Sequence, residues 1–326
     1  MHVSAELAAA IRAFEIGLPD RPPIPVGQAW SNEVWQIRTV EGAYAIKLFP
    51  PLSAPRRQEL EAGQRFEKLV LEAGIVPLPR PVASPAGWLV EVRSRTGLRL
   101  ARCHEWMHGV ATATPLGDEV VAAAGRYLGS LHALKQPGGD SSQLATLDRA
   151  RWDRAVQLAR AQDLGWAEGL ADLAPLVDDL AVDLDVLRDQ RRPMLISHRD
   201  YDPKNSLIDT SGRLVITDWD YAGPVLPGVE LIVGAASFAT TDRQVVAFVE
   251  SYCAVAGDLP HADPLAMTAE VSDLDWLLRN VDACVRGDLG PGSAQYTTAE
   301  SLISSLPHDV AIAHSWPRRL ADLVTS

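Results

Sequence analysis

The segment ISHRDYDPKNSLID, residues 196–209, concentrates charged and amide side chains between two apolar runs. His198, Asp200 and Asn205 follow the spacing H-x-D-x(4)-N, and Asp218 lies thirteen residues further on, in LVITDWD. Transfer of a phosphoryl group needs a carboxylate that orients the attacking hydroxyl, and oxygen ligands that hold magnesium on the nucleotide phosphates. Asp200 suits the first task, and Asn205 with Asp218 suits the second. The apolar runs SLI and LVI predict a hairpin that carries both metal ligands toward one point.

Each of these residues alone would be ordinary in a capped loop or a turn, so the interpretation depends on a second part of the chain. Lys47 lies in the middle of the predicted strand YAIKLF, with apolar residues on both sides. A strand lysine is common at an exposed edge, but one that faces inward needs an anion beside it. The phosphates of ATP and a helix glutamate would serve. We choose Glu61 in ELEAGQRF, with Glu59 as the alternative, because helical phase alone does not separate them.

A phosphate-binding loop is expected just before this strand. The segment VGQAWSNEVW offers Gly27, followed by Ser31 and Asn32, which we take as candidate cofactor contacts. One glycine does not make the pattern GxGxxG, so a plain β-turn is the competing interpretation.

Composition excludes several other classes of protein. The chain has 326 residues with 30 basic and 42 acidic side chains, a formal charge of −12 that argues against a nucleic-acid binder. Its three cysteines, Cys103, Cys253 and Cys284, form no CxxC motif, so neither a disulfide framework nor a zinc site is indicated. No apolar run approaches the roughly 20 residues of a membrane span. We therefore expect a cytoplasmic protein with no membrane or nucleic-acid partner.

The order of hydrophobic patterns predicts an α+β chain with two lobes. Residues 31–49 read as a hairpin around Glu41-Gly42, residues 56–74 as a helix, and residues 87–94 and 98–107 as two further strands. Residues 119–134 and 173–189 read as helices, residues 136–146 as a loop, and the chain after Glu230 as mostly helical. We place a strand-rich lobe at 1–105 and a larger helical lobe at 106–326. A small-molecule site is expected between them.

Taken together, SHRDYDPKN, VITDWDYAGP and YAIKLF resemble the aminoglycoside phosphotransferase and choline kinase superfamily, small-molecule relatives of the protein kinases. The resemblance runs from about Gly27 to Glu230, and YLGSLHAL at 127–134 resembles the helix before the catalytic loop in such enzymes. It implies a bilobal protein-kinase-like fold and the use of ATP or GTP with Mg²⁺.

The resemblance also implies a role for each matching residue. Asp200 would be the catalytic aspartate, and Asn205 and Asp218 would bind magnesium. Lys47 would bind the α and β phosphates, paired with Glu61. The residues that would form a hinge against adenine are Glu105, Trp106 and Met107, while His198 would hold the catalytic loop.

Two positions depart from the pattern of this superfamily, and the role of a third is open. Arg199 occupies a position that is glycine in many members of the superfamily and arginine in protein kinases. Glu230 in AGPVLPGVEL replaces the aspartate of a G-D-x-x-x-D-L-A element, which puts the anchoring of the loop in doubt. Asp220 could be a second metal ligand, although we favour a surface charge. A protein kinase is the less favoured alternative, because the chain lacks D-F-G, A-P-E and a glycine triplet.

The acceptor should contact the helical part of the chain. AEVSDLDWLLRNVDACVRGD places acidic residues around an aromatic one, a combination that suits a cationic acceptor, although such residues are also common on a solvated helix face. The candidates are Asp273, Asp275 and Trp276, with Glu230, and with Glu270 and Asp282 nearby.

We therefore predict an ATP-dependent phosphotransferase that acts on a hydroxyl of a small molecule, with an aminoglycoside or other cationic antibiotic as the first choice. Choline-like, homoserine-like and sugar acceptors remain open. A nucleotide-binding pseudokinase, or an acidic scaffold for a partner protein, would be the alternative from another class. The presence of Asp200, Asn205 and Asp218 favours an active enzyme.

Overall fold

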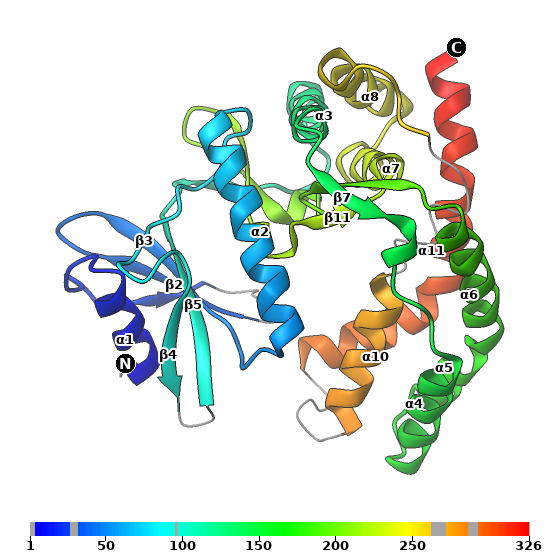
Figure 1. Cartoon of the computed structure of the whole chain (residues 1–326), viewed down its shortest axis with the longest axis horizontal. Coiled ribbons are helices and arrows are strands. Elements are labelled where there is room, and N and C mark those ends of the chain that lie inside the picture. Colours follow the sequence, from blue (N-terminus) through cyan, green and yellow to red (C-terminus); the bar gives the residue numbers. More distant parts are fainter. Residues whose placement is uncertain (1–3, 27–31, 95–96, 262–271, 286–292, 326) are drawn as a thin grey trace.

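The computed structural model describes residues 4–26, 32–94, 97–261, 272–285 and 293–325, and these form two lobes (Figure 1). The first lobe is a five-stranded antiparallel sheet of order β1-β2-β3-β5-β4 with two helices. Its elements are α1 (Ala5–Ala13), β1 (Ile24–Pro25), β2 (Glu33–Arg38), β3 (Ala43–Leu48), α2 (Ala54–Ala73), β4 (Val90–Ser94) and β5 (Gly97–Glu105). The predicted hairpin, helix and two further strands of this region are confirmed.

Strand alternation gives the sheet two different faces. On one face Ile46 and Leu48 of β3 pack with Ile37 of β2 against Leu7 and Ile11 of α1. Successive strand residues point to opposite sides, so Lys47 lies on the other face, which is turned away from α1. The sequence YAIKLF therefore buries Ile46 and Leu48 under α1 and presents its lysine to the interior between the lobes.

Helix α2 crosses from the sheet toward the second lobe, as Figure 1 shows. The side chain of Ser53 caps its start, and the chain leaves it at Gly74, whose φ of 63° favours glycine. Phe66 and Val70 join the core of the second lobe, whereas Leu60 joins a small cluster with Phe49 under the sheet. One helix thus contacts both lobes.

The second lobe is built mainly from helices, with two small antiparallel sheets of orders β10-β9-β6 and β11-β8-β7. Its elements are β6 (Gly109–Ala111), α3 (Asp118–Ala133), β7 (Pro137–Asp140), η1 (Ser141–Gln143), α4 (Arg149–Ala161), α5 (Ala167–Asp172), α6 (Ala174–Asp189), β8 (Pro193–Ser197), η2 (Pro203–Asn205), β9 (Ser206–Asp209), β10 (Leu214–Ile216), η3 (Trp219–Tyr221), β11 (Gly223–Val225), α7 (Pro227–Phe238), α8 (Asp242–Ala256), α10 (Ser272–Val285) and α11 (Ala294–Thr325).

One prediction about this lobe is wrong. Residues 136–146 were expected to form a loop, but they contain strand β7 and the turn η1. The main chain at Ser141 is held to Arg192, and its hydroxyl donates to the carbonyl of Leu187 at 2.6 Å. These long-range bonds order a segment whose glycine and serine content is typical of a loop.

The larger core packs α3, α7 and α8 around the segment that contains Tyr201 and Trp219, and it therefore supports the catalytic loop directly. A second core joins α4, α5, α6, α10 and α11. Within the described ranges, no helix is both long and apolar enough to cross a lipid bilayer.

Candidate active site

Lys47 reaches across from the sheet to the second lobe. Its ammonium lies 2.8 Å from Oδ1 of Asp218 and 2.5 Å from Oδ2 of Asp220. Burial alone would lower the pKa of Lys47, but the two carboxylates outweigh burial and raise it. Lys47 is therefore a charged group held between two anions.

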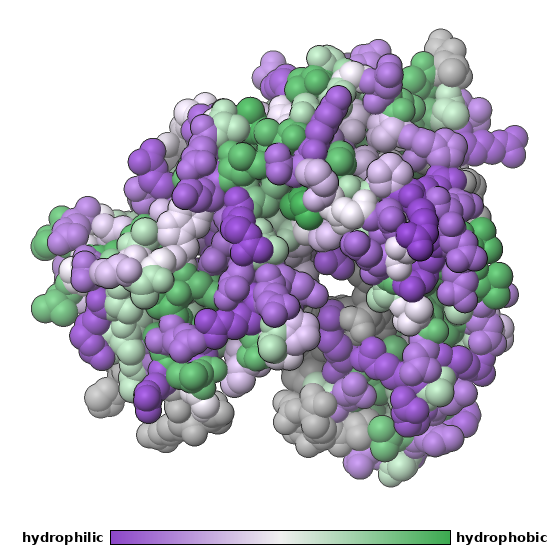
Figure 2. All heavy atoms as spheres, in the orientation of Figure 1, coloured by the Kyte–Doolittle hydropathy of each residue, from purple (hydrophilic) through white to green (hydrophobic). Residues whose placement is uncertain are grey.

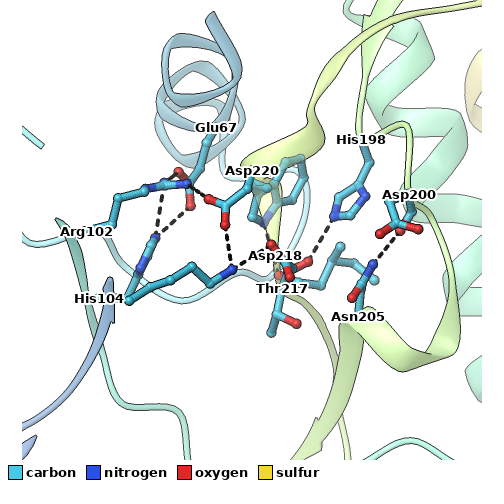
Figure 3. A network of polar contacts seen from close by, with 12 residues as sticks. Glu67, Arg102, His104, His198, Asp200, Asn205, Thr217, Asp218 and Asp220 are labelled. Carbon is cyan, nitrogen blue, oxygen red and sulfur yellow. Dashed lines mark hydrogen bonds and ion pairs between the residues drawn. The ribbon is translucent and has the colours of Figure 1, made fainter. Parts of the chain in front are cut away.

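Arg102 lies directly opposite Lys47 in the register of β3 and β5. It is almost fully buried, and its guanidinium donates to Oδ1 of Asp220 and to Oε2 of Glu67. His104 lies 3.0 Å from the other oxygen of Glu67. Figure 3 shows this chain of contacts running from Glu67 on α2 through Arg102 to Asp220.

These contacts decide the ionisation of the buried acids. Burial would raise the pKa of Asp220, but the neighbouring Lys47 and Arg102 outweigh it and hold the pKa below its usual range. Burial would likewise raise the pKa of Glu67, but Arg102 and then His104 lower it. Both carboxyl groups are thus anions in the folded protein.

The catalytic loop between β8 and β9 is held by hydrogen bonds to the segment before Asp218. The ring of His198, which is fully buried, donates through Nε2 to the carbonyl of Thr217 at 2.9 Å. The backbone N–H of Thr217 donates to the carbonyl of Asn205 at 2.8 Å. These two bonds place Asp218 beside the loop, where Figure 3 shows it next to His198 and Asn205.

Asp200 and Asn205 are tied to each other within this loop. Nδ2 of Asn205 donates to the carbonyl of Asp200 at 2.9 Å, which leaves the amide oxygen of Asn205 as its acceptor end. The carboxylate of Asp200 is partly exposed, and Nζ of Lys204 lies 3.0 Å from it. The loop therefore presents the carboxylate of Asp200 beside an amide oxygen, next to a second partly exposed carboxylate, that of Asp218.

The comparisons with known proteins agree with this geometry. The sequence model described as the phosphotransferase enzyme family matches residues 23–265, which is more than half of the chain. The chain belongs to the phosphotransferase enzyme family. It is accordingly an enzyme, a small-molecule kinase that phosphorylates an alcohol group. No curated protein matches the sequence significantly.

Solved structures place this phosphotransferase in the protein-kinase-like fold of the superfamily. An aminoglycoside phosphotransferase from Alicyclobacillus acidocaldarius shares 16% identity and a TM-score of 0.55, covering 100% of this chain and 98% of the other. Spectinomycin phosphotransferase in complex with ADP and spectinomycin shares 13% identity and a TM-score of 0.58, covering 91% and 92%. A choline/ethanolamine kinase family protein from Mesorhizobium loti shares 17% identity and a TM-score of 0.55, covering 98% and 99%.

In this phosphotransferase, the predicted ion pair of Lys47 with an α2 glutamate is not formed. Glu61 does not pair with Lys47, because it lies on the outer side of α2 and bonds Arg57 at 3.0 Å. Glu59 is also exposed and bonds Arg56 at 2.8 Å. The α2 glutamate that enters the buried network is Glu67, two helical turns beyond Glu59.

Two further expectations are wrong. Asp220 is not a surface charge, because its side chain is 3% exposed and bonds Lys47. Glu230 does not face an acceptor, because it is buried and its Oε1 accepts the backbone N–H of Arg199 at 2.5 Å. Its other oxygen lies 2.7 Å from Nε2 of His132, which in turn contacts the hydroxyl of Tyr252. Glu230 thus anchors the catalytic loop, as an aspartate would at this place.

Sequence reasoning did not identify Glu67, Arg102 and His104. The one signal was that Arg102, in LRLARCH, stands in a predicted strand with apolar neighbours, as Lys47 does. The pairing register of β3 and β5, which places these two cations side by side, cannot be obtained from the sequence pattern alone. His104 immediately precedes the predicted hinge, but its pairing with α2 follows from the fold alone.

Several predicted contacts lie outside the described residues or stay predictions. Ser31 and Glu270 are not described, and neither are the side chains of Asp273, Asp275 and Trp276 on α10. Asp282 on the same helix lies 3.8 Å from Arg151.

The residues of the predicted phosphate loop and hinge are placed, and their roles stay predictions. Asn32 is half-buried next to β2. Glu105 is exposed, and its N–H bonds the carbonyl of Arg80 at 2.8 Å, while the N–H of Trp106 bonds Ala43 at 2.8 Å. Met107 is half-buried beyond them.

The donor atoms beside the catalytic loop fit a magnesium ion. Among the described residues no group of three or more histidine, cysteine or acidic side chains is arranged for a metal. Magnesium does not need such a cage, because it keeps several waters and is bound through one or two carboxylates together with nucleotide phosphates. One amide oxygen, from Asn205, and one carboxylate, from Asp218, are a suitable set.

Proposed function

We propose that this chain transfers the γ-phosphate of ATP or GTP, with Mg²⁺, to a hydroxyl of a cationic small molecule, and that an aminoglycoside or another cationic antibiotic is the acceptor. The observation that carries the proposal is the contact between Lys47 and Asp218. It joins the strand lysine of one lobe to the carboxylate that follows the catalytic loop of the other.

The face of the sheet that carries Lys47 suits a nucleotide. Ala43 and Ala45 precede Lys47 on this face and leave room beside it for a flat base. A cavity of about 400 Å³ lies at the turn of the β2–β3 hairpin and includes Ala43 and His108 in its lining, but not Lys47 or the hinge residues. Because the N–H groups of Glu105 and Trp106 are used within the protein, Met107 is the hinge residue that we expect to donate to the base.

The roles of the loop residues follow from their positions. Asp200 accepts or orients the proton of the acceptor hydroxyl, since its carboxylate is partly exposed and, unlike that of Asp218, does not contact Lys47. Asn205 and Asp218 hold Mg²⁺, which when bound neutralises charge on the nucleotide phosphates. When nucleotide binds, the ammonium of Lys47 leaves Asp218 and contacts phosphate oxygens. Its contact with Asp220 is kept, so the position of the ammonium changes little.

Charge supports a cationic acceptor. The chain carries a formal charge of −12, which favours the approach of a cation. Structural neighbours with the same fold include a spectinomycin phosphotransferase, an aminopropanol kinase and a choline kinase. Aminopropanol and choline are amino or ammonium alcohols, which is the chemistry that we propose for this acceptor.

The test is the release of ADP from Mg-ATP across a panel of aminoglycosides, cationic peptide antibiotics, choline, aminopropanol, homoserine and simple sugars. We expect turnover with an aminoglycoside or another cationic antibiotic and none with the simple sugars. Turnover with choline, aminopropanol or homoserine instead would indicate a metabolic kinase and overturn the antibiotic assignment.

Two variants separate the catalytic role from nucleotide binding. Asp200→Asn should abolish turnover and leave the Kd for Mg-AMP-PNP within about threefold of wild type, because the carboxylate acts on the acceptor side. Asp218→Asn should instead weaken nucleotide binding in the presence of magnesium. Absence of Mg-nucleotide binding by the wild-type protein would sink the kinase assignment.

A further inference from the structure

A second cavity, of about 350 Å³, lies between α2 and the residues that follow Asp220. Helix α2 contributes Arg56, Arg65 and Phe66 to its lining, the catalytic loop contributes Arg199, and η3 contributes Tyr221. Lys47, Asp200, Asn205 and Asp218 do not line it, so it is distinct from the proposed nucleotide and magnesium site. Figure 1 shows α2 beside β11, and the surface over α2 in Figure 2 is largely hydrophilic.

The charge of this cavity is opposite to that of the chain. Three arginines line it, although the protein carries a net charge of −12. Glu59 is the one carboxylate in the described lining, and it is already paired with Arg56 at 2.8 Å. Arg56 is further held by the carbonyl of Asp220 at 3.3 Å and lies 4.1 Å from the centre of the Tyr221 ring.

Arg65 and Arg199 are different from Arg56. In the part of the chain that the structure describes, neither guanidinium has a carboxylate within ion-pair distance, and both side chains are exposed to solvent. Two guanidinium groups without a carboxylate partner line the same cavity, one from α2 and one from the catalytic loop. A guanidinium group binds phosphate and carboxylate groups through two-pronged hydrogen bonds. The cavity therefore offers donors suited to an anion.

Apart from Gln136, the rest of the lining is apolar. Phe66 and Leu69 of α2 face Ile196, Ala222 and Pro224 across the cavity. The volume falls at the lower end of the range for small-molecule sites, which are typically lined by apolar side chains with a few polar groups. An inorganic ion alone would leave this apolar surface uncovered.

We propose that this cavity is a second ligand site, which binds a small organic anion. A phosphate or carboxylate group is held by Arg65 and Arg199, and an apolar ring or chain lies against Phe66 and Leu69. Since Arg199 directly precedes Asp200 and Tyr221 directly follows Asp220, the occupant joins α2 to both catalytic segments. Any change that it causes in the affinity for Mg-nucleotide must, by linkage, be matched by an equal change that nucleotide causes in its own affinity.

The proposal is tested by calorimetric titration of the full chain with phenyl phosphate, with inorganic phosphate and benzyl alcohol as part-ligands. We expect phenyl phosphate to bind at least about tenfold more tightly than either part-ligand. Binding should persist when Mg-AMP-PNP is saturating. Because no turnover is measured, the result is independent of whether the acceptor in the previous section is correct.

Arg65→Gln is the deciding variant, since Arg65 is an exposed α2 residue outside the catalytic contacts, and Lys68→Gln is its matched control. Lys68 is an exposed cation on the same helix that does not line the cavity. Arg65→Gln should weaken phenyl phosphate at least about tenfold and Lys68→Gln should leave its Kd unchanged. The proposal would be overturned by equal losses in the two variants or by no binding to wild type at millimolar concentration. It would also be overturned if nucleotide displaced phenyl phosphate, or if inorganic phosphate bound with equal affinity.

Discussion

Lys47 on β3 and Arg102 on β5 are direct cross-strand neighbours, and the carboxylate of Asp220 binds both of them. Like charges opposite each other on adjacent strands normally destabilise a sheet. Here one oxygen of Asp220 takes the ammonium and the other takes the guanidinium, while Glu67 binds Arg102 from the side of α2. The active-site lysine is thus connected to α2 through three successive ion pairs, Lys47–Asp220, Asp220–Arg102 and Arg102–Glu67, without touching a glutamate of that helix.

The first prediction concerns the strength of the Arg102–Glu67 pair. Arg102→Met should lower the free energy of unfolding by about 3–5 kcal/mol, because it leaves a buried carboxylate without its partner. Combined with Glu67→Gln, the loss should be smaller than the sum of the single losses by about 2 kcal/mol. Urea unfolding of the four proteins in this cycle measures the coupling.

The matched control for this cycle is Arg57→Met with Glu61→Gln, an exposed pair on the same helix. Its coupling should be below about 0.5 kcal/mol, as for other solvated pairs four residues apart on a helix. Equal coupling in the two cycles would contradict a special role for the buried network.

The second prediction is the pH dependence that Glu67 imposes. Its pKa in the folded protein lies below the ordinary value of 4.5, so the unfolded chain takes up a proton first as the pH falls. The stabilisation from this carboxylate is therefore complete above pH 4.5 and decreases below it. Glu67→Gln should lower stability most at neutral pH and flatten the acid side of the profile, measured as urea midpoints between about pH 3 and 7. An acid limb that stays unchanged in the variant would assign the effect to other carboxyl groups.

The third prediction separates two roles for Glu230. If it anchors the loop through the N–H of Arg199, Glu230→Ala should reduce kcat at least about tenfold through misplacement of Asp200, and the KM for ATP should change little. Glu230→Gln keeps an oxygen acceptor for that N–H and should retain most of the activity. Steady-state kinetics with the acceptor found by the panel, at a temperature where both variants are folded, gives the comparison. A rise in the acceptor KM alone would restore the acceptor role that the sequence suggested.

Local pattern was sufficient for some parts of the site and not for others. The hairpin of Lys47 and the loop of His198 and Asn205 depend on short spacings, and the structure has both. Helix α2 carries several glutamates, and Glu67, which shares its buried face with Leu60 and Phe66, meets Arg102 only in the assembled fold. Asp220 reaches the lysine because Asp218 adopts a left-handed φ of 59° before η3, a turn that no spacing rule predicts. Contacts between distant strands and helices, such as those of Arg102, require the assembled fold.

The fourth prediction concerns the packing of α3 against α8, which brings Tyr252 to within 2.8 Å of Nδ1 of His132. At Gly125 a Cβ atom would lie 2.1 Å from the carbonyl oxygen of Phe248, and this atom belongs to the helix backbone, not to a flexible side chain. Gly125→Ala should therefore force the helices apart and destabilise the protein by about 3 kcal/mol, despite the better helix propensity of alanine. Gly165→Ala is the control, because a Cβ there meets nothing within 4 Å, and its effect should stay within about 0.5 kcal/mol. Thermal and urea unfolding of both variants measures the difference, and a neutral Gly125→Ala would show that α3 and α8 are not in such close contact in solution.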